Sequence, residues 1–522
     1  MDAEELKATD LDHFIYHLGQ FQEDIDYLKT RVKEGAILAT MLPTAKLQLI
    51  GRYCYDILNY AWIGDEKGHW VRYIKGKWHD NVATALSNAI QLYIDEIKIP
   101  PSTYRKGVIM EHIKHNNHYF FEQMNRQRHI INFKNGFLDT VDFSFDPDNN
   151  DQKHLFTYQI PFEYKPDAES KVFLPWLYDI LEGDWDRIDL MLKFMGYCLT
   201  LEVKFQKILI LKGPKRTGKS TVLNVLAELL GPENRSTVPL QRLARRFGTM
   251  GIVHKPLNYY VDISTTRAIG DTSKIKILVD EEVDVEFKGG ALTTVKNVTK
   301  HVFSTNRLPP VKGLDLAYAR RFIIVEFLKE IAREDVIPGF DKIITEDVEE
   351  MQGIISLIVD AYEELCEDGY FKSQTDEEVY EIIMMETDSV YRFIRQLCDV
   401  GPQFEEDQEE LYLAYTEFAT ADGALDIMKK GPFTSDLKLK GYGTRRSSQK
   451  NADGKRPYLY TGLKLKESEF YGTDEVPVSG IDDFLKDIKP EITLEDAARE
   501  EFESLDLDDE DEHRVVEDPF NI

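Results

Sequence analysis

The sequence predicts an α/β protein: a parallel sheet at the centre, a mostly helical region before it and a small mixed domain after it. From Asp2 to about Asn125, apolar residues recur at three- and four-residue spacing, which is typical of amphipathic helices. Strands and helices alternate from Lys207 to Phe327, which favours a parallel sheet. Helical segments and a basic two-stranded stretch follow between about 388 and 466.

The length of the chain indicates several domains, because 522 residues exceed what one compact core usually holds. We expect boundaries at 1–199 for the mostly helical N-terminal region, 200–330 for the sheet, 331–387 for a helical linker, 388–470 for the small domain and 471–522 for an acidic tail. The four cysteines are far apart, so neither a zinc site nor a disulfide framework is indicated.

Acidic residues are concentrated at the end of the chain. The net charge is −29, and fifteen acids stand against four bases from Leu485 to Ile522. We expect this tail to be disordered until it meets a partner, or to act only as a solubilising tail. Because a nucleic-acid-binding protein needs bases only where it touches phosphates, the overall charge argues only weakly against such a partner.

Shorter elements are expected on both sides of the sheet. The segment 70–78 predicts a β-hairpin. The segment 130–139 predicts strand, turn and strand, because Asn135-Gly136 supplies the positive φ of a tight turn. Helices are expected over 173–199, with a break at Gly183-Asp184, and again over 330–368.

A phosphate-binding loop is the strongest motif in the sequence. The apolar strand 207–212 runs into a GxxxxGK[ST] match, and a helix follows. The residues predicted to contact a nucleotide are Gly213, Pro214, Lys215, Arg216, Thr217, Gly218, Lys219, Ser220 and Thr221. The glycines let backbone N–H groups face the phosphates, Lys219 adds a cation, and the Ser220 hydroxyl coordinates Mg²⁺.

Polar residues of the kind that phosphoryl transfer needs accompany the next strands. Asp262 ends the apolar strand 257–262 and is a candidate Mg²⁺ ligand, and Asn306 ends another strand and is placed to orient the attacking water. Arg320 and Arg321 come just before a buried strand, where a guanidinium can reach a neighbouring subunit's nucleotide. Taken singly, each of these residues has an ordinary alternative as a cap, turn or surface ion-pair residue.

A second group of cations lies in the small C-terminal domain. Its members are Lys438, Lys440, Arg445, Arg446, Lys450, Lys455 and Arg456, with three tyrosines among them. In an acidic chain this cluster favours contact with a nucleic-acid backbone over a merely basic surface loop.

The order of these motifs resembles the superfamily 3 helicases, in particular the D5-like, phage P4-type branch. The shared features are the phosphate loop, an LNxxxD strand, a hairpin, FSTNRLP and ARRF. The segments 132–139, 160–168 and 194–199 are similar to the D5 N-terminal region, and 411–462 is similar to the winged-helix domain that often follows the motor.

This resemblance implies an AAA+-like motor that forms a ring, expected to be a hexamer. It would hydrolyse ATP with Mg²⁺, move 3′ to 5′ on single-stranded DNA and unwind duplex during viral, phage or plasmid replication. By the same resemblance Lys219 and Ser220 bind ATP·Mg²⁺, Asp262 is the Walker B acid and also a Mg²⁺ ligand, and Asn306 is sensor 1. Arg321 is then the arginine finger, with Arg320 as the second choice.

The resemblance also implies a DNA-gripping hairpin at 285–290, whose Lys288 stands at a Gly-Gly turn. A lysine there fits a sequence-independent contact with phosphate, although a solvated hairpin lysine would look the same. The D5-like region is expected to form a collar, and the winged helix to touch DNA or another protein.

Two departures from the family pattern affect the expected function. Val261 stands where a second Walker B acid is usual, so hydrolysis is expected to be slow. Only about forty residues precede the D5-like region, so we expect a helicase without its own primase. A separate primase, polymerase or other replication protein would then be a partner through the acidic tail.

Other functions remain open at this point. An ATP-dependent origin-binding and melting initiator with weak unwinding fits Val261 and the winged helix, and a platform that binds ATP without turnover is also compatible. RNA in place of DNA is not excluded, because the expected contacts are to the backbone. No apolar run has the length of a membrane span, and we expect the cytoplasm, of the host if the gene is viral or phage-encoded.

Overall fold

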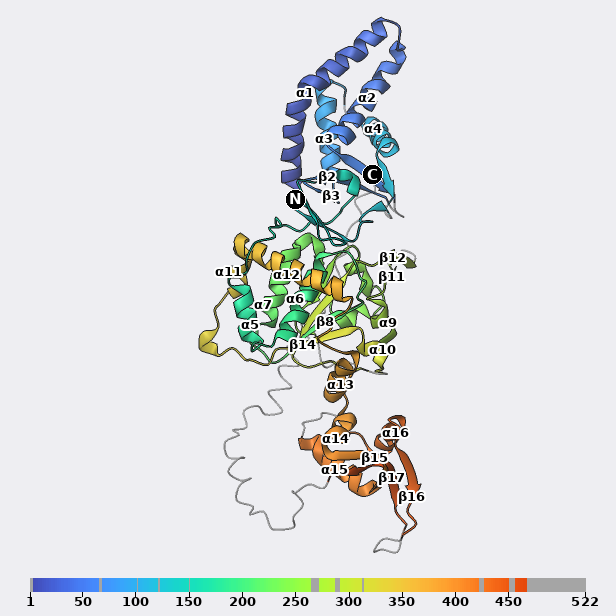
Figure 1. Ribbon diagram of the computed structural model, residues 1–522. Coiled ribbons are helices and arrows are strands. Elements are labelled where there is room, and N and C mark those ends of the chain that lie inside the picture. Colours follow the sequence, from blue (N-terminus) through green and yellow to red (C-terminus); the bar gives the residue numbers. More distant parts are fainter. Residues whose placement is uncertain are drawn as a thin grey trace, which may run out of the picture. The chain divides into compact units, whose positions relative to one another are not determined.

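The structure of the protein is a computed structural model (Figure 1). It describes residues 3–64, 68–100, 102–120, 123–149, 151–263, 272–286, 292–311, 314–421, 427–449 and 456–466. The chain divides into two compact units, Met1–Gln396 with Tyr412–Gly441, and Leu397–Leu411 with Tyr442–Ile522. The expected mixture of helices and sheets is confirmed.

The N-terminal region combines four helices with a four-stranded sheet. The helices are α1 (Ala3–Lys33), α2 (Leu42–Arg52), α3 (Ala83–Glu96) and α4 (Thr103–Asn116). The sheet has the order β3 (Lys77–His79), β2 (His69–Ile74), β1 (Tyr60–Gly64) and β4 (His118–Phe120). The rings of Phe21, Tyr53 and Tyr93 meet edge-on in its core. The hairpin expected at 70–78 is confirmed as β2 and β3, but β1 and β4 were not expected, because their pairing joins segments far apart in sequence.

A three-stranded sheet follows, made of β5 (Ile130–Phe133), β6 (Gly136–Asp139) and β7 (Phe145–Pro147). The expected strand, turn and strand are confirmed, but the turn residues are Lys134 and Asn135, and Gly136 begins β6. Gly136 has a φ of +146°, and a Cβ there would lie 2.2 Å from the carbonyl oxygen of Asp146. Only glycine is compatible with this backbone, which explains the Asn-Gly signal.

The central sheet is parallel throughout, as the alternation of strands and helices predicts. Its five strands have the order β14-β8-β13-β10-β9. Their bounds are β8 (Ile208–Lys212), β9 (Arg235–Ser236), β10 (Leu257–Tyr260), β13 (Lys300–Thr305) and β14 (Phe322–Glu326). The strand order puts β8 beside both β13 and β14, so the carboxyl ends of these strands meet at one edge.

Alternate residues of these strands build a core on each face of the sheet. Leu209 and Leu211 belong to the core with α5 (Phe173–Ile180), α6 (Trp185–Leu199), α7 (Lys219–Leu230) and α12 (Val348–Asp368). Ile208 and Ile210 belong to the core with α8 (Leu240–Leu243), α9 (Thr272–Ile277), α10 (Leu316–Ala319) and α13 (Asp376–Thr387). The segment expected to be a linker therefore supplies core helices on both faces of the sheet.

Part of the segment 330–368 is not helical. A single 3₁₀ turn, Arg333–Asp335, precedes α11 (Phe340–Glu346) and α12. The expectation of a continuous helix from 330 is wrong over 330–332 and 336–339. Pro338 and Gly339 interrupt the second stretch, and Gly339 has a φ of +70°. The backbone N–H of Ile331 donates instead to the carbonyl of Arg216 at 2.8 Å, so this segment runs beside the phosphate loop.

The C-terminal elements alternate helices and strands. In the first unit, the rings of Phe393, Tyr415 and Phe433 join α14 (Ser389–Leu397), α15 (Gln408–Ala421) and α16 (Lys430–Leu439). In the second unit, an antiparallel sheet has the order β15 (Cys398–Asp407), β17 (Tyr458–Leu465) and β16 (Gly443–Arg446). The two-stranded basic stretch is therefore confirmed, and β15 is a strand that was not expected.

A hairpin also leaves the central sheet between β10 and β13. Its strands β11 (Glu282–Glu286) and β12 (Leu292–Lys296) pair antiparallel, which confirms a hairpin at this place in the chain. Its turn, with Lys288, lies outside the described residues, as do Lys450, Lys455 and the acidic tail. Among the helices that the structure describes, none combines the length and apolar character needed to cross a bilayer.

Candidate functional site

The predicted phosphate loop connects the end of β8 to the start of α7. Gly213 and Gly218 have φ values of +155° and +88°. A Cβ on Gly213 would lie 2.0 Å from the carbonyl oxygen of Phe327, and one on Gly218 would lie 2.8 Å from the ring of Trp176. Both glycines are thus required by the backbone conformation and by a close neighbour. α7 begins directly after the loop, so its N-terminal N–H groups face the same space.

Lys219 holds its ammonium group inside this loop. Its Nζ donates to the carbonyls of Gly213 at 2.8 Å and Pro214 at 2.5 Å, and to the Thr217 hydroxyl at 3.1 Å. Only 8% of the residue is exposed, and burial lowers its pKa against the opposing effect of Asp262. A buried cation held only by neutral groups has a strong preference for an anion, so this site fits a phosphate chemically.

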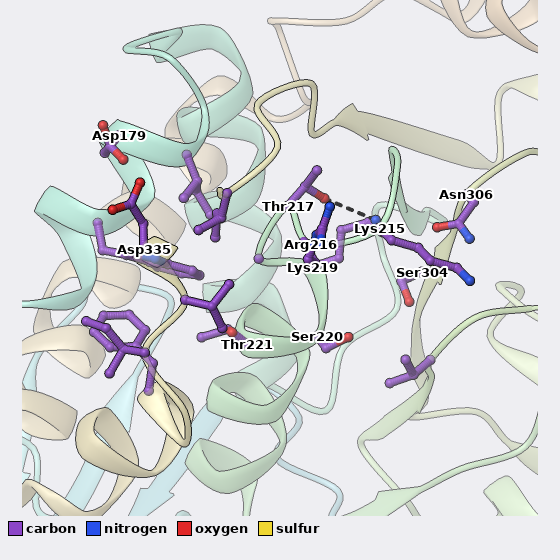
Figure 2. Close-up of a pocket in the computed structure, with 18 of the residues that line it drawn as sticks. Asp179, Lys215, Arg216, Thr217, Lys219, Ser220, Thr221, Ser304, Asn306 and Asp335 are labelled. Carbon is purple, nitrogen blue, oxygen red and sulfur yellow. Dashed lines mark hydrogen bonds between the residues drawn. The ribbon is translucent and has the colours of Figure 1, made fainter. Parts of the chain in front are cut away.

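A cavity of about 480 Å³ opens over the loop. Along one side it is lined by the whole stretch from Lys215 to Thr221, and its wall continues through Asp262, Ser304 and Asn306. In Figure 2, Ser304 and Asn306 lie on one side of the loop, and Asp179 and Asp335 lie on the other. The structure therefore brings most of the predicted nucleotide residues together with Asp262 and Asn306.

The strand order explains why Asp262 and Asn306 share this cavity. β13 lies between β8 and β10, so Asn306 follows the strand next to the phosphate loop and Asp262 follows the strand beyond it. The two strand ends are joined, because the Asp262 N–H donates to the Ser304 hydroxyl at 3.0 Å. Asp262 itself has a φ of +59°, a left-handed conformation that costs energy and is often found at functional sites.

Val261 forms part of the same wall. It is 41% exposed, which is unusual for a valine, and it lines the cavity beside Asp262. Among the described residues that line the cavity, the carboxylates belong to Asp179, Asp262 and Asp335. Asp262 is thus the acid nearest the phosphate loop. An acid in place of Val261 would line the same part of the cavity.

Several cavity residues were not found by sequence reasoning. They come from α5 and from the segment after β14, and they are Trp176, Asp179, Ile180, Ile331, Asp335, Val336, Ile337 and Phe340. No motif marks them, because they are brought to the loop by tertiary packing. The one available sequence signal was the apolar pair Val336 and Ile337 directly before Pro338-Gly339. In the structure these two side chains are 44% and 56% exposed.

Glu386 of α13 is another unexpected neighbour of the loop strand. Its carboxylate pairs with the Lys212 ammonium at 2.6 Å and accepts the N–H of Leu308 at 2.8 Å. Burial opposes the charged form of Lys212, but hydrogen bonds to Glu386 and Glu326 outweigh it and raise the pKa of Lys212. α13 is thereby attached to the ends of the loop strand and of the strand that carries Asn306.

Arg320 and Arg321 lie at the amino end of the parallel strands, opposite the end that carries the phosphate loop. In the register of β14 and β8, Phe322 faces Ile208 and Glu326 faces Lys212. The two arginines are therefore about 13 Å or more from the end of β8, at about 3.3 Å per residue. Neither lines the cavity of its own chain.

The two arginines differ in exposure. Arg320 is exposed, whereas Arg321 is 9% exposed, and its Nη2 lies 3.7 Å from Oδ1 of Asp280. The Nε of Arg321 has no hydrogen-bond partner among the described residues. Burial lowers the pKa of Arg321, and the neighbouring charge of Arg320 adds to this effect. Arg321 therefore has an unused hydrogen-bond donor, whereas Arg320 is the more exposed of the two side chains.

The C-terminal cations have different environments. Lys438 is exposed on α16, but Lys440 is held by Asp388 at 2.6 Å and Asp436 at 2.7 Å. In the second unit, Arg445 pairs with Glu405, Arg446 lies over the Tyr458 ring at 5.7 Å, and Arg456 is exposed. Contact with a nucleic acid stays a prediction for all of them.

Comparisons with known proteins support part of the expected relationship. Residues 46–182 match the family model described as D5 N terminal like, which confirms a D5-like region there; the segment 194–199 lies outside the match. Residues 211–321, from the end of β8 to Arg321, match a family of unknown function (DUF5906). These two matches cover most of the N-terminal region and the part of the sheet region from the end of β8 up to Arg321, just before β14.

Solved structures of the NrS-1 C terminal region resemble the chain only distantly. An apo A form has a TM-score of 0.45 and 13% identity, and it covers 78% of this chain and 98% of that chain. A second apo structure has a TM-score of 0.45 and 12% identity, over 79% and 99%. Likenesses at this level are too remote to support a conclusion about function.

Proposed function

We propose that the protein is an ATP-driven, ring-forming helicase of the superfamily 3 type that unwinds DNA during phage, viral or plasmid replication. The observation that carries the proposal is the cavity itself. It gathers the phosphate loop, Asp262 and Asn306 at the carboxyl edge of a parallel sheet, where open α/β sheets usually bind ligands. The match of residues 46–182 to the D5 N terminal like family adds support.

The residues of the cavity divide the work of phosphoryl transfer. Lys219 and the loop N–H groups bind the β- and γ-phosphates, and Ser220 with Asp262 would hold Mg²⁺, which neutralises phosphate charge when bound. Asn306 orients the attacking water. Asp262 is the acid at hand to accept its proton, because Val261 offers none.

A ring is needed to complete this site. Arg320 and Arg321 are too far from their own phosphate loop, so they serve a neighbouring subunit's nucleotide across an interface. The order of elements after the sheet, with helices α14 to α16 and strands β15 to β17, supports the proposal of a winged helix, which would present Arg445, Arg446 and Arg456 to DNA.

A second function is favoured by one observation, the exposed Val261 in the cavity wall. With a single acid near the phosphates, slow turnover suits an initiator that melts an origin, or a platform that binds ATP without hydrolysis. Comparing ATPase stimulation by single-stranded DNA and by origin duplex separates the helicase from the initiator.

The main test is unwinding of a forked duplex with labelled 3′ and 5′ arms. We expect displacement that needs ATP, starts from the 3′ arm and is lost in Lys219→Ala and Arg321→Ala. Absence of any DNA-stimulated ATP hydrolysis by the wild-type protein would contradict the proposal.

A further inference from the structure

The cavity has an apolar end that phosphate chemistry does not explain. Trp176 and Ile180 reach it from α5, and Ile331, Val336, Ile337 and Phe340 reach it from the segment after β14. The ring of Trp176 lies against Gly218 of the phosphate loop, so the apolar part of the cavity adjoins the loop directly. The rings of Trp176 and Phe340 are 5.4 Å apart.

The exposure of these side chains points to a ligand. Val336 and Ile337 are 44% and 56% exposed, yet they line the same cavity as the cationic loop with its buried Lys219. Isolated exposed apolar residues are common, but a concave group next to a phosphate site is typical of a ligand pocket. A flat heteroaromatic base is the part of a nucleotide that gains from such a wall, through stacking and burial.

The same end carries a free hydrogen-bond acceptor. Asp179 is paired with Lys329 at 2.6 Å, whereas no side chain in the described part of the chain holds the carboxylate of Asp335. Figure 2 shows Asp335 on the side of the loop away from Asn306. An ionised carboxylate only accepts hydrogen bonds, so it favours an amino group over a carbonyl oxygen.

We propose that this apolar end is the nucleobase slot, that Trp176 and Ile337 form its walls, and that Asp335 selects adenine through its 6-amino group. The inference rests on the proposed function, because it assumes a triphosphate on Lys219. It adds that base recognition comes from segments outside the 200–330 region. The helix α5 before the sheet and the segment 331–340 after it would close on the base together.

The first experiment separates base from phosphate binding in the full chain. Dissociation constants of ATP and of inorganic tripolyphosphate, both with Mg²⁺, are measured by competition against a fluorescent ATP. Ile337→Ser should weaken ATP by about fivefold to tenfold and leave tripolyphosphate unchanged, given the usual size of base stacking and apolar burial. Ile343→Ser is the matched control, because Ile343 is 55% exposed but lies outside the cavity.

Trp176→Leu should also weaken ATP about tenfold. Because Trp176 supports the loop at Gly218, its tripolyphosphate affinity shows whether the phosphate site is intact. Unchanged ATP affinity in both Ile337→Ser and Trp176→Leu, with binding still dependent on Lys219, would overturn the slot but not the proposed function. Failure of the wild type to bind either ATP or tripolyphosphate would overturn both.

The second experiment tests the selection of adenine. Inosine triphosphate differs from ATP in having a carbonyl in place of the 6-amino group. The wild type should bind ATP about tenfold more tightly, and Asp335→Asn should bring the ratio close to one, because an amide also donates. Glu334→Gln removes the same charge from the neighbouring exposed residue outside the cavity and should leave the ratio unchanged. An unchanged ratio in Asp335→Asn would rule out Asp335 as the selector.

Discussion

The two ends of the parallel strands carry the residues that the proposed function assigns to two halves of one catalytic site. At the carboxyl edge, the phosphate loop, Asp262 and Asn306 line a common cavity. At the amino end, Arg320 and Arg321 precede β14, far from the phosphate loop of their own chain. The difference arises because parallel strands send all their carboxyl ends to one side, while a residue placed before a strand stays on the other.

Under the proposed function, the carboxyl ends of the strands bind the nucleotide, and the arginines at the amino end act on the nucleotide of a neighbouring subunit. The division between the two ends can be tested by changing each end separately.

Mixing two inactive proteins gives the strongest test. Lys219→Ala should lose nucleotide binding, and the double variant Arg320→Ala/Arg321→Ala should keep binding but lose hydrolysis by about a thousandfold. In an equal mixture, about a quarter of random ring interfaces pair an intact lysine with an intact arginine. ATPase activity should therefore reappear in the mixture. If it stays at the level of the separate variants, the arginines do not act across an interface. The single variants then decide between Arg320, which is exposed, and Arg321, which is buried.

Asn306 should matter for the rate and little for binding. Asn306→Ala removes the amide that orients water, so we expect kcat to fall about a hundredfold with ATP affinity within a factor of about two. Stopped-flow hydrolysis and equilibrium binding measure the two effects. If ATP affinity fell as much as kcat, Asn306 would instead contact the phosphates of bound ATP before the reaction.

Val261→Glu should increase activity. The side chain at 261 is exposed toward the cavity beside Asp262, so a carboxylate there supplies a second acid near the attacking water. We expect kcat to rise about tenfold, at the low end of what a general base contributes. Val261→Gln is the matched control, because it has the same size without the charge. An equal rise in both variants would show that basicity is not the cause.

Lys300 begins β13 at the amino edge and should affect stability without changing the chemistry. It is fully buried, and desolvation lowers its pKa to about 7. Between pH 7 and about 10.5 the unfolded chain binds more protons than the folded one, so the free energy of unfolding should rise with pH. The slope is at most about 1.4 kcal/mol per pH unit.

Lys300→Met should remove this slope in denaturant titrations between pH 7.5 and 9.5, with ATP affinity unchanged. A wild-type stability that falls over this range would contradict the assignment of the slope to Lys300. The two ends of β13 should therefore differ in effect. A change at Lys300 alters stability, whereas a change at Asn306 is expected to alter the rate of ATP hydrolysis.

The local chemistry of the site could be predicted from the sequence. The spacing of Gly213, Gly218 and Lys219 defines the loop, and apolar runs ending in Asp262 and Asn306 mark two strand ends. These signals are local, because a turn that needs positive φ or a strand that ends in a polar residue depends on a few neighbours. The hairpin at 70–78 and the break at Gly183-Asp184 were predictable for the same reason. The alternation of strands and helices predicted the parallel sheet, and the family resemblance implied the hairpin between β10 and β13.

What only the tertiary structure decided was which of these pieces meet. Strand order placed β13 between β8 and β10, and so brought Asn306 and Asp262 to the loop. The parallel direction of β14 put Arg321, which precedes that strand, at the opposite end of the sheet. Packing brought Trp176 and Ile337 to the cavity and Glu386 to Lys212, across long stretches of chain that carry no motif. The physical reason is that strand order and helix packing are set by the burial of whole apolar faces, which no short pattern encodes.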